Sequence, residues 1–174
     1  SPSANGMPYQ TVGSLHLDFD GISNYNDYYR DLDIAKAIAT TRFTTNGVTY
    51  TREAYTSFPD QVLVIRLTAS QKKSISFTAK YTTPYKSNVV RSISSRKELQ
   101  LSGKANDHEG IEGKVEFTAL TRIENNGGSL EATSDSTLQV KHANSVTLYV
   151  SIGTNFVNYK DVSGNALSTA QKYL

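Results

Sequence analysis

The clearest alternation of residues in the chain is Thr40-Thr-Arg-Phe-Thr-Thr-Asn-Gly-Val-Thr-Tyr-Thr-Arg-Glu-Ala-Tyr55. Within it, Asn46-Gly47 separates two runs of alternating residues, which is the strongest short-range signal of a β-hairpin. Both central positions of a type I′ turn have positive φ, and Asn and Gly tolerate that geometry best. A two-residue loop also fixes the register and predicts the cross-strand pairs Thr45–Val48, Phe43–Tyr50 and Thr41–Arg52. The stretch therefore predicts an antiparallel sheet.

The same period of two extends along most of the chain. Gln61–Ala69 is apolar on both faces, which is typical of a central strand that is covered on both sides. Further strands are expected near Leu17–Phe19 and over Ile75–Tyr81, Leu99–Leu101, Val115–Ile123, Leu130–Ala132, Leu138–Val140 and Val146–Ile152. The last two are expected to form a hairpin across His142–Ser145. No interior segment has the pattern of a good helix, so about nine or ten strands predict an all-β, antiparallel β-sandwich.

The composition narrows the class of protein. The chain has 174 residues, which fits one domain better than two. It contains no Cys, which excludes a disulfide scaffold, a thiolate metal site and a Cys nucleophile. Lys and Arg total 18 against 16 Asp and Glu, and they are scattered, whereas nucleic-acid binders concentrate them on one face. We therefore expect no nucleic acid as a partner. Because no apolar stretch approaches the length of a membrane-spanning helix, we expect no membrane as a partner either.

Both ends of the chain indicate a piece of a longer protein. The sequence starts at Ser1, its only methionine is Met7, and it has no signal peptide. Ala166–Leu174 begins like a helix, with apolar residues at helical spacing and no room to continue. We divide the chain into a partial β-sandwich domain, residues 1–165, and the start of a truncated linker helix, residues 166–174.

Tyr25, Tyr28 and Tyr29 are the strongest candidates for ligand binding. They lie in a stretch rich in Ser and Asn that is typical of a loop, and exposed aromatic rings are surfaces on which sugars stack. The alternative is that the rings cover the edge of the sandwich or dock against a neighbouring domain, which is the commoner fate of clustered tyrosines. The absence of Trp, the largest stacking platform, favours this alternative.

Acidic residues are densest between Asp18 and Asp33, and paired carboxylates can act as the acid and base of a glycosidase. However, Asp18 and Asp20 alternate with Leu17 and Phe19, which places them on the outer face of a strand that ends there. We therefore interpret these acids as solvated surface residues rather than as a site.

A second polar group contains His108, Glu109 and Glu112. A metal site needs convergent ligands, and the neighbouring Gly110 and Gly113 indicate a polar loop instead. We find no phosphate-binding loop, nucleophile elbow or zinc motif elsewhere. The sequence therefore predicts no catalytic residue, no metal and no cofactor in this chain.

The segment Asn155-Phe-Val-Asn-Tyr-Lys-Asp161 follows the last expected strand. Its rings, Phe156 and Tyr159, are expected to pack over the end of the sheet. We expect an interdomain interface here, with Asn155, Asn158, Tyr159 and Asp161 as its candidate residues. A packing role is favoured over direct contact with a ligand.

Five segments of the chain occur in an order that is itself informative. They are Met7-Pro-Tyr-Gln-Thr-Val-Gly-Ser-Leu-His-Leu-Asp-Phe19, Tyr29-Arg-Asp-Leu-Asp-Ile-Ala-Lys-Ala37, Gly47-Val-Thr-Tyr-Thr-Arg-Glu53, Pro59-Asp-Gln-Val-Leu-Val-Ile-Arg-Leu67 and Thr154-Asn-Phe-Val-Asn-Tyr-Lys-Asp161. Together these segments resemble the N-terminal domain of the family 95 glycoside hydrolases, which are typified by α-L-fucosidases. The resemblance spans nearly the whole chain.

This resemblance implies a supersandwich, followed in the family by a helical linker and an (α/α)6 barrel. The barrel carries the catalytic acid and the residues that activate water for inverting hydrolysis of terminal α-L-fucosyl linkages. None of those motifs occurs here, so no catalytic residue is carried over. Family members usually begin with a Trp-containing stretch that this chain lacks. The resemblance thus implies that the first strands of the sandwich are missing, and exposed strand edges favour dimers of the fragment.

Two functions from different classes follow from these observations. The leading hypothesis is a non-catalytic N-terminal domain that packs against the barrel of the same polypeptide and shapes the rim of its active site. Fucosylated glycans would then be partners of the parent protein, which the family resemblance implies to be bacterial and periplasmic or extracellular. The alternative is a free-standing carbohydrate-binding or adhesion module that uses its surface tyrosines.

Overall fold

The computed structural model describes residues 9, 11–22 and 24–174, so Met7, Pro8 and Gln10 of the segment that begins at Met7 lie outside the described residues. The chain forms twelve strands and one helix within this part. The strands are β1 (Ser14–Phe19), β2 (Asn26–Asp33), β3 (Ile38–Thr45), β4 (Val48–Ser57), β5 (Val62–Ala69), β6 (Ile75–Thr82), β7 (Val89–Ile93), β8 (Leu99–Lys104), β9 (Glu116–Asn126), β10 (Ser129–Ser134), β11 (Thr137–Ala143) and β12 (Ser145–Thr154), and the helix is α1 (Ala166–Lys172). No described helix has both the length and the apolar character needed to cross a membrane.

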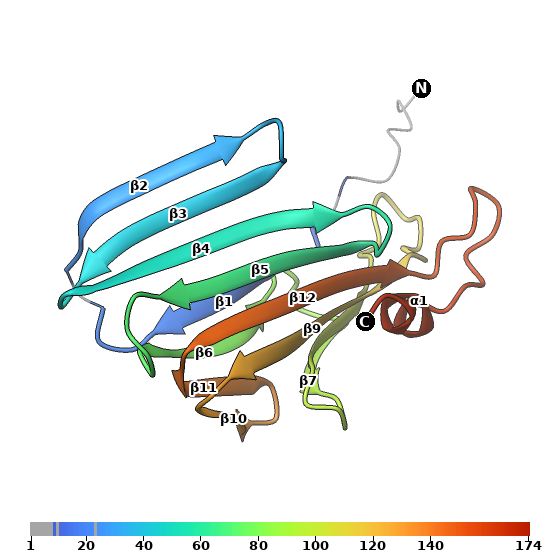
Figure 1. Ribbon diagram of the computed structural model, residues 1–174. Helices are drawn as coiled ribbons and strands as arrows, with labels where there is room; N and C mark the ends of the chain where they lie inside the picture. Colours follow the sequence, from blue (N-terminus) through green and yellow to red (C-terminus); the bar gives the residue numbers. More distant parts are fainter. Residues whose placement is uncertain (1–8, 10, 23) are drawn as a thin grey trace.

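The strands form two antiparallel sheets that pack face to face, which confirms the predicted β-sandwich (Figure 1). The smaller sheet has four strands in the order β1-β6-β11-β10. The larger has eight strands in the order β2-β3-β4-β5-β12-β9-β8-β7. Because the sheets differ in width, strands at one end of the larger sheet extend past the smaller one. We use the term overhang for β2, β3 and residues 52–54 of β4.

The hydrophobic core lies between the sheets where both are present. In β6, Ile75, Phe77, Ala79 and Tyr81 are buried and alternate with partly exposed residues, as a period of two requires. They pack against the inner face of the larger sheet, which contributes Leu67, Leu99, Leu101, Phe117, Ala119, Ile123, Val146 and Leu148. Burial of this apolar surface is the main source of stability.

The hairpin at Asn46-Gly47 forms as the sequence predicts. Asn46 has φ 50° and Gly47 has φ 75°, so both central residues of the turn are left-handed. All three predicted cross-strand pairs occur, and the rings of Phe43 and Tyr50 stack with their centroids 5.4 Å apart. The strand predicted over Gln61–Ala69 is β5, which is confirmed as an interior strand of the larger sheet.

Two strands that the sequence does not predict are β2 and β7. They form the two edges of the larger sheet, most residues of β2 are exposed, and neither strand has a fully buried residue. An edge strand with little buried surface needs no alternation of apolar and polar residues, so its sequence carries little signal. The interpretation of the Tyr25–Tyr29 stretch as a loop is therefore wrong for Tyr28 and Tyr29, which lie in β2.

The expected hairpin across His142–Ser145 is also wrong. Ala143 pairs with Ile75 in the smaller sheet, whereas Ser145 pairs with Thr68 in the larger one. The chain thus crosses from one sheet to the other through Asn144. Both strands alternate toward the same core, so periodicity alone cannot distinguish a crossover from a hairpin.

A short helix does form from Ala166. The Asn165 side chain accepts a hydrogen bond from the Ser168 backbone N–H, which caps the helix N-terminus. The helix packs against the outer face of β9 and β12, and the Ser151 hydroxyl donates to the Ala170 carbonyl oxygen. Gly153 permits this close approach, because a Cβ atom there would lie 2.4 Å from the Ala166 carbonyl oxygen.

Candidate functional site

The three candidate tyrosines divide between the two faces of the larger sheet. Tyr25 and Tyr28 line a groove of ≈ 490 Å³ on the inner face of the overhang. Tyr29 lies on the opposite face, where the Arg42 guanidinium is 5.4 Å from its ring centre. Consecutive strand residues point to opposite faces, which explains the separation of Tyr28 from Tyr29. The structure therefore brings together only two of the three tyrosines.

The rings in this groove contact one another at an angle. The centroids of Tyr25 and Tyr28 are 5.7 Å apart with an interplanar angle of 50°. Tyr25 also makes an edge contact with Phe43 at 6.0 Å. The aromatic cluster is half exposed, because Tyr25 and Tyr28 keep 59% and 55% of their surface accessible. Such geometry forms an apolar corner rather than a flat platform.

Two arginines, Arg30 and Arg52, give this groove a positive charge, and neither is among the site residues predicted from the sequence. The Arg52 guanidinium lies 5.6 Å from the ring centre of Phe19, and its Nε atom is buried with no hydrogen-bond partner among the described residues. Burial lowers the pKa of Arg52. A signal existed in the sequence, because the hairpin register puts Arg52 on the same face as Phe43 and Tyr50.

The second candidate region is the loop that follows β12. Asn155 is buried, and its side chain accepts from the Glu116 backbone N–H at 2.8 Å and donates to the Lys114 carbonyl oxygen at 3.1 Å. Its polar atoms thus anchor the loop to the start of β9. Of the four candidate interface residues, Asn155 is the one that is buried.

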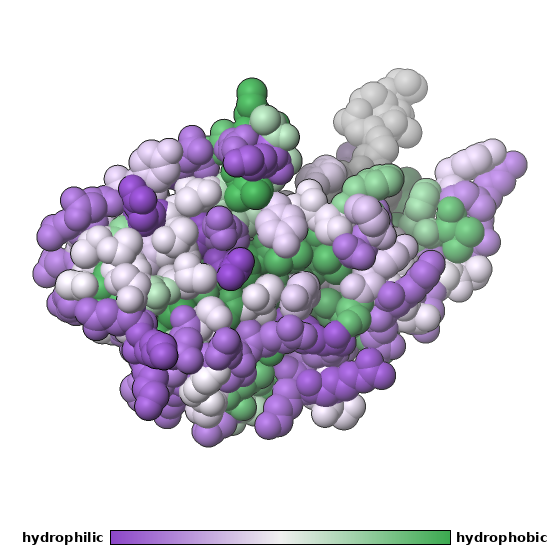
Figure 2. Space-filling view, in the orientation of Figure 1, coloured by the Kyte–Doolittle hydropathy of each residue, from purple (hydrophilic) through white to green (hydrophobic). Residues whose placement is uncertain are grey.

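The remainder of this loop is exposed and held by local hydrogen bonds. Asn158 and Asp161 form an isolated antiparallel bridge, and the Asn158 side chain accepts from the Lys160 backbone N–H. Hydrogen bonds from Ser163 lower the pKa of Asp161. The loop exposes three large apolar side chains, which are Phe156, Val157 and Tyr159. The space-filling view shows apolar surface at the right, where this loop lies (Figure 2).

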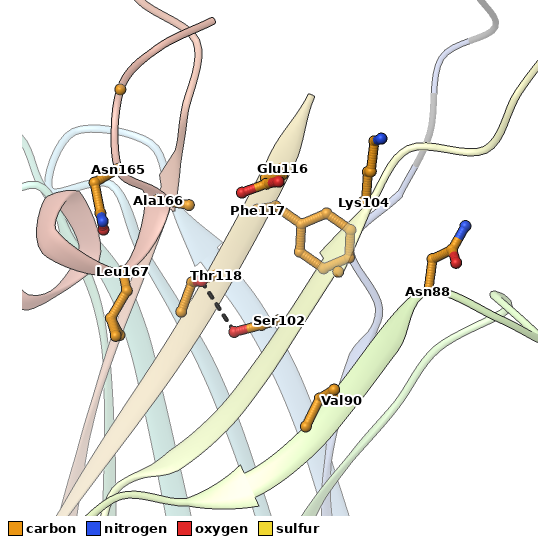
Figure 3. Close-up of a pocket in the computed structure, with 12 residues that line it drawn as sticks. Asn88, Val90, Ser102, Lys104, Glu116, Phe117, Thr118, Asn165, Ala166 and Leu167 are labelled. Atoms are coloured by element: carbon orange, nitrogen blue, oxygen red, sulfur yellow. Dashed lines mark hydrogen bonds between the residues drawn. The ribbon is translucent and has the colours of Figure 1, made fainter. Parts of the chain in front are cut away.

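A third hollow lies beside the helix, on the outer face of β8 and β9 (Figure 3). Its volume is ≈ 480 Å³, and the Ser102 and Thr118 hydroxyls in its wall are 3.0 Å apart. Lys104 at its rim pairs with Glu112 at 2.7 Å, and this contact raises the pKa of Lys104. Glu116 is the one carboxylate among the described lining residues, so no acid–base pair of carboxylates forms here.

The acidic candidates occupy surface positions. Asp18 lies on the outer face of β1, as predicted, and its carboxylate accepts from the Lys80 amine at 2.7 Å, which lowers the pKa of Asp18. His108 belongs to a tight turn closed by backbone hydrogen bonds with Ile111. Within residues 9, 11–22 and 24–174, no three His, Asp or Glu side chains are close enough to hold a metal ion.

Comparisons with known proteins identify what this sandwich is similar to. The family model described as the N-terminal domain of glycosyl hydrolase family 65 matches residues 1–159. "Alpha-L-fucosidase 2" of Arabidopsis thaliana is 28% identical over 178 residues, which covers 87% of this chain and 21% of that protein. "Probable alpha-fucosidase A" of Aspergillus oryzae is 25% identical over 151 residues, which covers 85% of this chain and 20% of that protein.

A solved structure also matches, that of a human-microbiome protein described as a kojibiose phosphorylase. It is 16% identical with a TM-score of 0.46, and the match covers 91% of this chain and 21% of that chain. The chain thus spans about a fifth of the length of the relatives that it matches.

The expected resemblance to the N-terminal domain of a sugar hydrolase is confirmed, although the family number differs. The segments quoted from the sequence indicate family 95, whereas the matching model is that of family 65. The α-fucosidase relatives agree with the resemblance. Since the model matches residues 1–159 of 174, the chain belongs to the family of glycosyl hydrolase family 65 N-terminal domains.

Proposed function

We propose that this chain is the non-catalytic N-terminal domain of an α-L-fucosidase-like glycoside hydrolase. In this proposal it packs against an (α/α)6 barrel of the same polypeptide and shapes the rim of the active site. The barrel would hydrolyse terminal α-L-fucosyl linkages with inversion. The names of the two plant and fungal relatives support the choice of sugar.

The loop after β12 carries this proposal. Tyr159 keeps 84% of its surface exposed and Phe156 keeps 53%, on a loop whose backbone is fixed by the Asn158–Asp161 bridge. Apolar side chains that are exposed on an ordered segment are typical of a protein interface. Aromatic residues also dominate the energetic centres of interfaces. We therefore place the barrel contact at this loop.

The interface is tested with the variants Phe156→Ser and Tyr159→Ser. In the 174-residue chain these exposed positions should leave the free energy of unfolding within about 0.5 kcal/mol of the wild type. In the polypeptide that includes the barrel, each variant should lower the melting temperature and the fucosidase activity. Phe58→Ser is the matched control, because Phe58 is 86% exposed and lies outside the loop. Equal effects of Phe58→Ser and Phe156→Ser in the longer polypeptide would overturn the proposal.

The non-catalytic assignment has its own test. The purified 174-residue chain is incubated with an aryl α-L-fucoside, and we expect no release of the aryl group above the buffer rate. Clear turnover that purifies with the chain would contradict the assignment.

A second candidate function is binding of a sugar by the overhang. The observation in its favour is the pair Tyr25 and Tyr28, which share one groove. Titration with fucosylated glycans while tyrosine fluorescence is recorded tests it, with Tyr28→Ala as the variant that should abolish the signal. Tyr29→Ala is the control, because Tyr29 lies on the other face. Equal titration curves for both variants would exclude the groove as a sugar site.

A further inference from the structure

Another hollow lies on the outer face of the larger sheet, beside Leu174, and we call it the outer pocket. Its volume is ≈ 530 Å³. Its lining includes three tyrosines and two carboxylates, which are Tyr55, Tyr149, Tyr173, Asp60 and Glu124. It shares no described lining residue with the overhang groove or with the hollow beside α1. Figure 2 shows this face of the molecule, with apolar surface in its middle between polar residues.

The strand register puts two of these tyrosines on either side of one valine. Tyr55 of β4 pairs with Val64 of β5, and Val64 pairs with Tyr149 of β12. Tyr50, five residues before Tyr55 in the same strand, packs on the core, so Tyr55 and its two neighbours point outward. Val64 nevertheless keeps only 6% of its surface exposed. Neighbouring side chains therefore stand over it, and we interpret the tyrosines as walls with the valine as the floor.

The distance between the two walls suits a single flat ring. Tyr55 and Tyr149 are two strand spacings apart, which is about 10 Å at their backbones. Carbon atoms in favourable contact lie about 3.5 to 4.0 Å apart, so a ring held between two walls needs about 7 to 8 Å. A sugar ring presents an apolar C–H face, and aromatic side chains are the surfaces on which such a face packs.

The polar groups of the outer pocket include both donors and acceptors of hydrogen bonds. Arg122 of β9 lies directly opposite Tyr149, and Glu124 follows on the same face of that strand. Asp60 borders the pocket after β4, where its carboxylate accepts from the Ser57 hydroxyl at 2.6 Å. An ammonium ion only donates and a carboxylate ion only accepts, whereas each hydroxyl of a sugar does both. A neutral polyhydroxyl ligand therefore uses this set of groups most fully.

The arginine of the outer pocket is held in place before any ligand binds. The Nη2 and Nε atoms of Arg122 donate to the buried Glu98 carboxylate at 2.6 Å and 3.0 Å. Its Nη1 atom donates to the Leu174 carbonyl oxygen, which keeps the end of the chain beside the pocket. These contacts leave further N–H groups of the guanidinium for a ligand. Because the site is fixed in advance, a ligand loses less of its binding energy to ordering the protein.

The hollow beside α1 does not offer the same combination. Its one aromatic residue among the described lining residues is Phe117, which belongs to the core between the sheets. The hydroxyls of Ser102 and Thr118 in its wall are 3.0 Å apart and already hydrogen-bond to each other. Outward-pointing rings together with charged hydrogen-bonding groups thus distinguish the outer pocket.

We propose that the outer pocket binds a neutral pyranose, which packs between Tyr55 and Tyr149 and hydrogen-bonds to Glu124 and Arg122. This inference goes beyond the proposed function, because it depends neither on the barrel contact at the β12 loop nor on the overhang groove. Combined with the proposed function, such a site would keep a glycan on the enzyme while the barrel acts on the end of that glycan.

The first test titrates the isotope-labelled 174-residue chain with methyl β-D-glucopyranoside and with methyl α-L-fucopyranoside. We expect at least one of these glycosides to cause saturable chemical-shift changes at the amides of Val64, Tyr149 and Glu124, with a Kd in the millimolar range. Choline and acetate are the charged probes and should bind at least about tenfold more weakly, because each can use only one kind of hydrogen-bonding group. No saturable change with either glycoside up to about 100 mM, or equal or tighter binding of a charged probe, would overturn the proposal.

Matched variants identify the pocket. Tyr55→Ala removes one wall and should weaken binding of the glycoside about tenfold. Glu124→Gln replaces a charged acceptor with a neutral one and should weaken it by a similar factor. Both residues are exposed, so the spectra of these variants should match the wild type away from the pocket.

Tyr29→Ala is the control on the same face of the sheet, and Tyr28→Ala is the control for the overhang groove. Both should retain the wild-type affinity for the glycoside. Wild-type affinity in Tyr55→Ala, or an equal loss in Tyr29→Ala and Tyr55→Ala, would contradict the assignment.

The last test asks whether the outer pocket is open in the longer polypeptide that includes the barrel. Calorimetry with the same glycoside should show a binding event that Tyr55→Ala removes. The absence of such an event would overturn the proposal, because the pocket would then be covered by another part of the protein. Phe156 and Tyr159 are unchanged in this variant, so that outcome leaves the barrel contact at the β12 loop to be judged separately.

Discussion

The middle of the molecule and the overhang are both built from antiparallel strands but differ in what covers these strands. In the middle, the smaller sheet covers the inner face of the larger sheet, and α1 covers part of its outer face. In the overhang, β2 and β3 form a single layer. Phe77 in β6 is fully buried, whereas Tyr28 in β2 keeps 55% of its surface exposed. The comparison separates residues that are buried between two sheets from residues that a single layer leaves exposed.

The two regions also differ in whether a buried arginine has a hydrogen-bond acceptor. In the middle, Glu98 is only 2% exposed, and Arg122 pairs with it at 2.6 Å through Nη2 and at 3.0 Å through Nε. The same guanidinium donates to the Leu174 carbonyl oxygen, which connects β9 to the end of the chain after α1. In the overhang, the buried Nε of Arg52 has no acceptor among the described residues. Arg122 in the two-layer region is therefore paired, whereas the Nε atom of Arg52 in the single-layer overhang is not.

The largest effect should come from deleting a ring in the two-layer region. Phe77→Ala removes a fully buried side chain that packs against Phe19, and it should lower the free energy of unfolding by about 3 to 5 kcal/mol. Tyr28→Ala in the overhang is the matched change and should cost less than about 1 kcal/mol. Chemical denaturation of both variants measures the difference. Equal losses would show that the overhang is as closely packed as the middle.

The two arginines should give the next largest contrast. Arg122→Met leaves the buried Glu98 carboxylate without its cation and should cost about 3 kcal/mol. Arg52→Met removes an unsatisfied buried donor and should change the free energy of unfolding by less than about 0.5 kcal/mol, or stabilise the chain.

Urea denaturation of both arginine variants compares the two costs. The double variant Glu98→Leu with Arg122→Met controls for packing and should recover most of the loss, because it removes both charges. If Arg52→Met costs as much as Arg122→Met, the distinction between the paired and the unpaired arginine fails.

The same contrast explains how much of the fold could be predicted from the sequence. Strands with a buried face, such as β5 and β6, have an alternation that reflects the core, and the Asn46-Gly47 turn adds a local rule for register. The edge strands β2 and β7 bury little, so their residues follow no pattern that a prediction can use. The crossover at Asn144 cannot be predicted from local periodicity, because sheet membership depends on long-range pairing.

The candidate sites were predicted less well than the fold. The tyrosine cluster was located, but separating Tyr29 from Tyr28 requires knowing that both lie in a strand. The role of Asn155 as an internal anchor depends on Lys114 and Glu116, about forty residues away in sequence, and no local rule identifies such a contact. The inward position of Arg52 can be predicted, because the hairpin register places this charged side chain on the apolar face of the sheet, where a charge is unexpected.

The smallest of the three expected changes in the free energy of unfolding comes from a buried tyrosine hydroxyl in the two-layer region, and it appears only at alkaline pH. The Tyr81 hydroxyl is buried and lies 2.5 Å from the Thr121 hydroxyl. Burial raises the pKa of Tyr81 from 10.0 to about 12. Since the folded pKa exceeds the unfolded pKa, the stabilisation is complete below pH 10 and is lost as the pH rises toward about 12. The loss should amount to about 2 to 3 kcal/mol.

Tyr81→Phe and Thr121→Val separate the causes of this alkaline instability. Tyr81→Phe cannot ionise at this site, so its stability should decline less steeply between pH 10 and about 12, as followed by circular dichroism in denaturant. Thr121→Val removes the hydrogen bond that lowers the pKa of folded Tyr81, so the decline should still begin near pH 10 but extend to higher pH. An alkaline decline of the same steepness in Tyr81→Phe and in the wild type would mean that ionisation of the buried Tyr81 is not its cause.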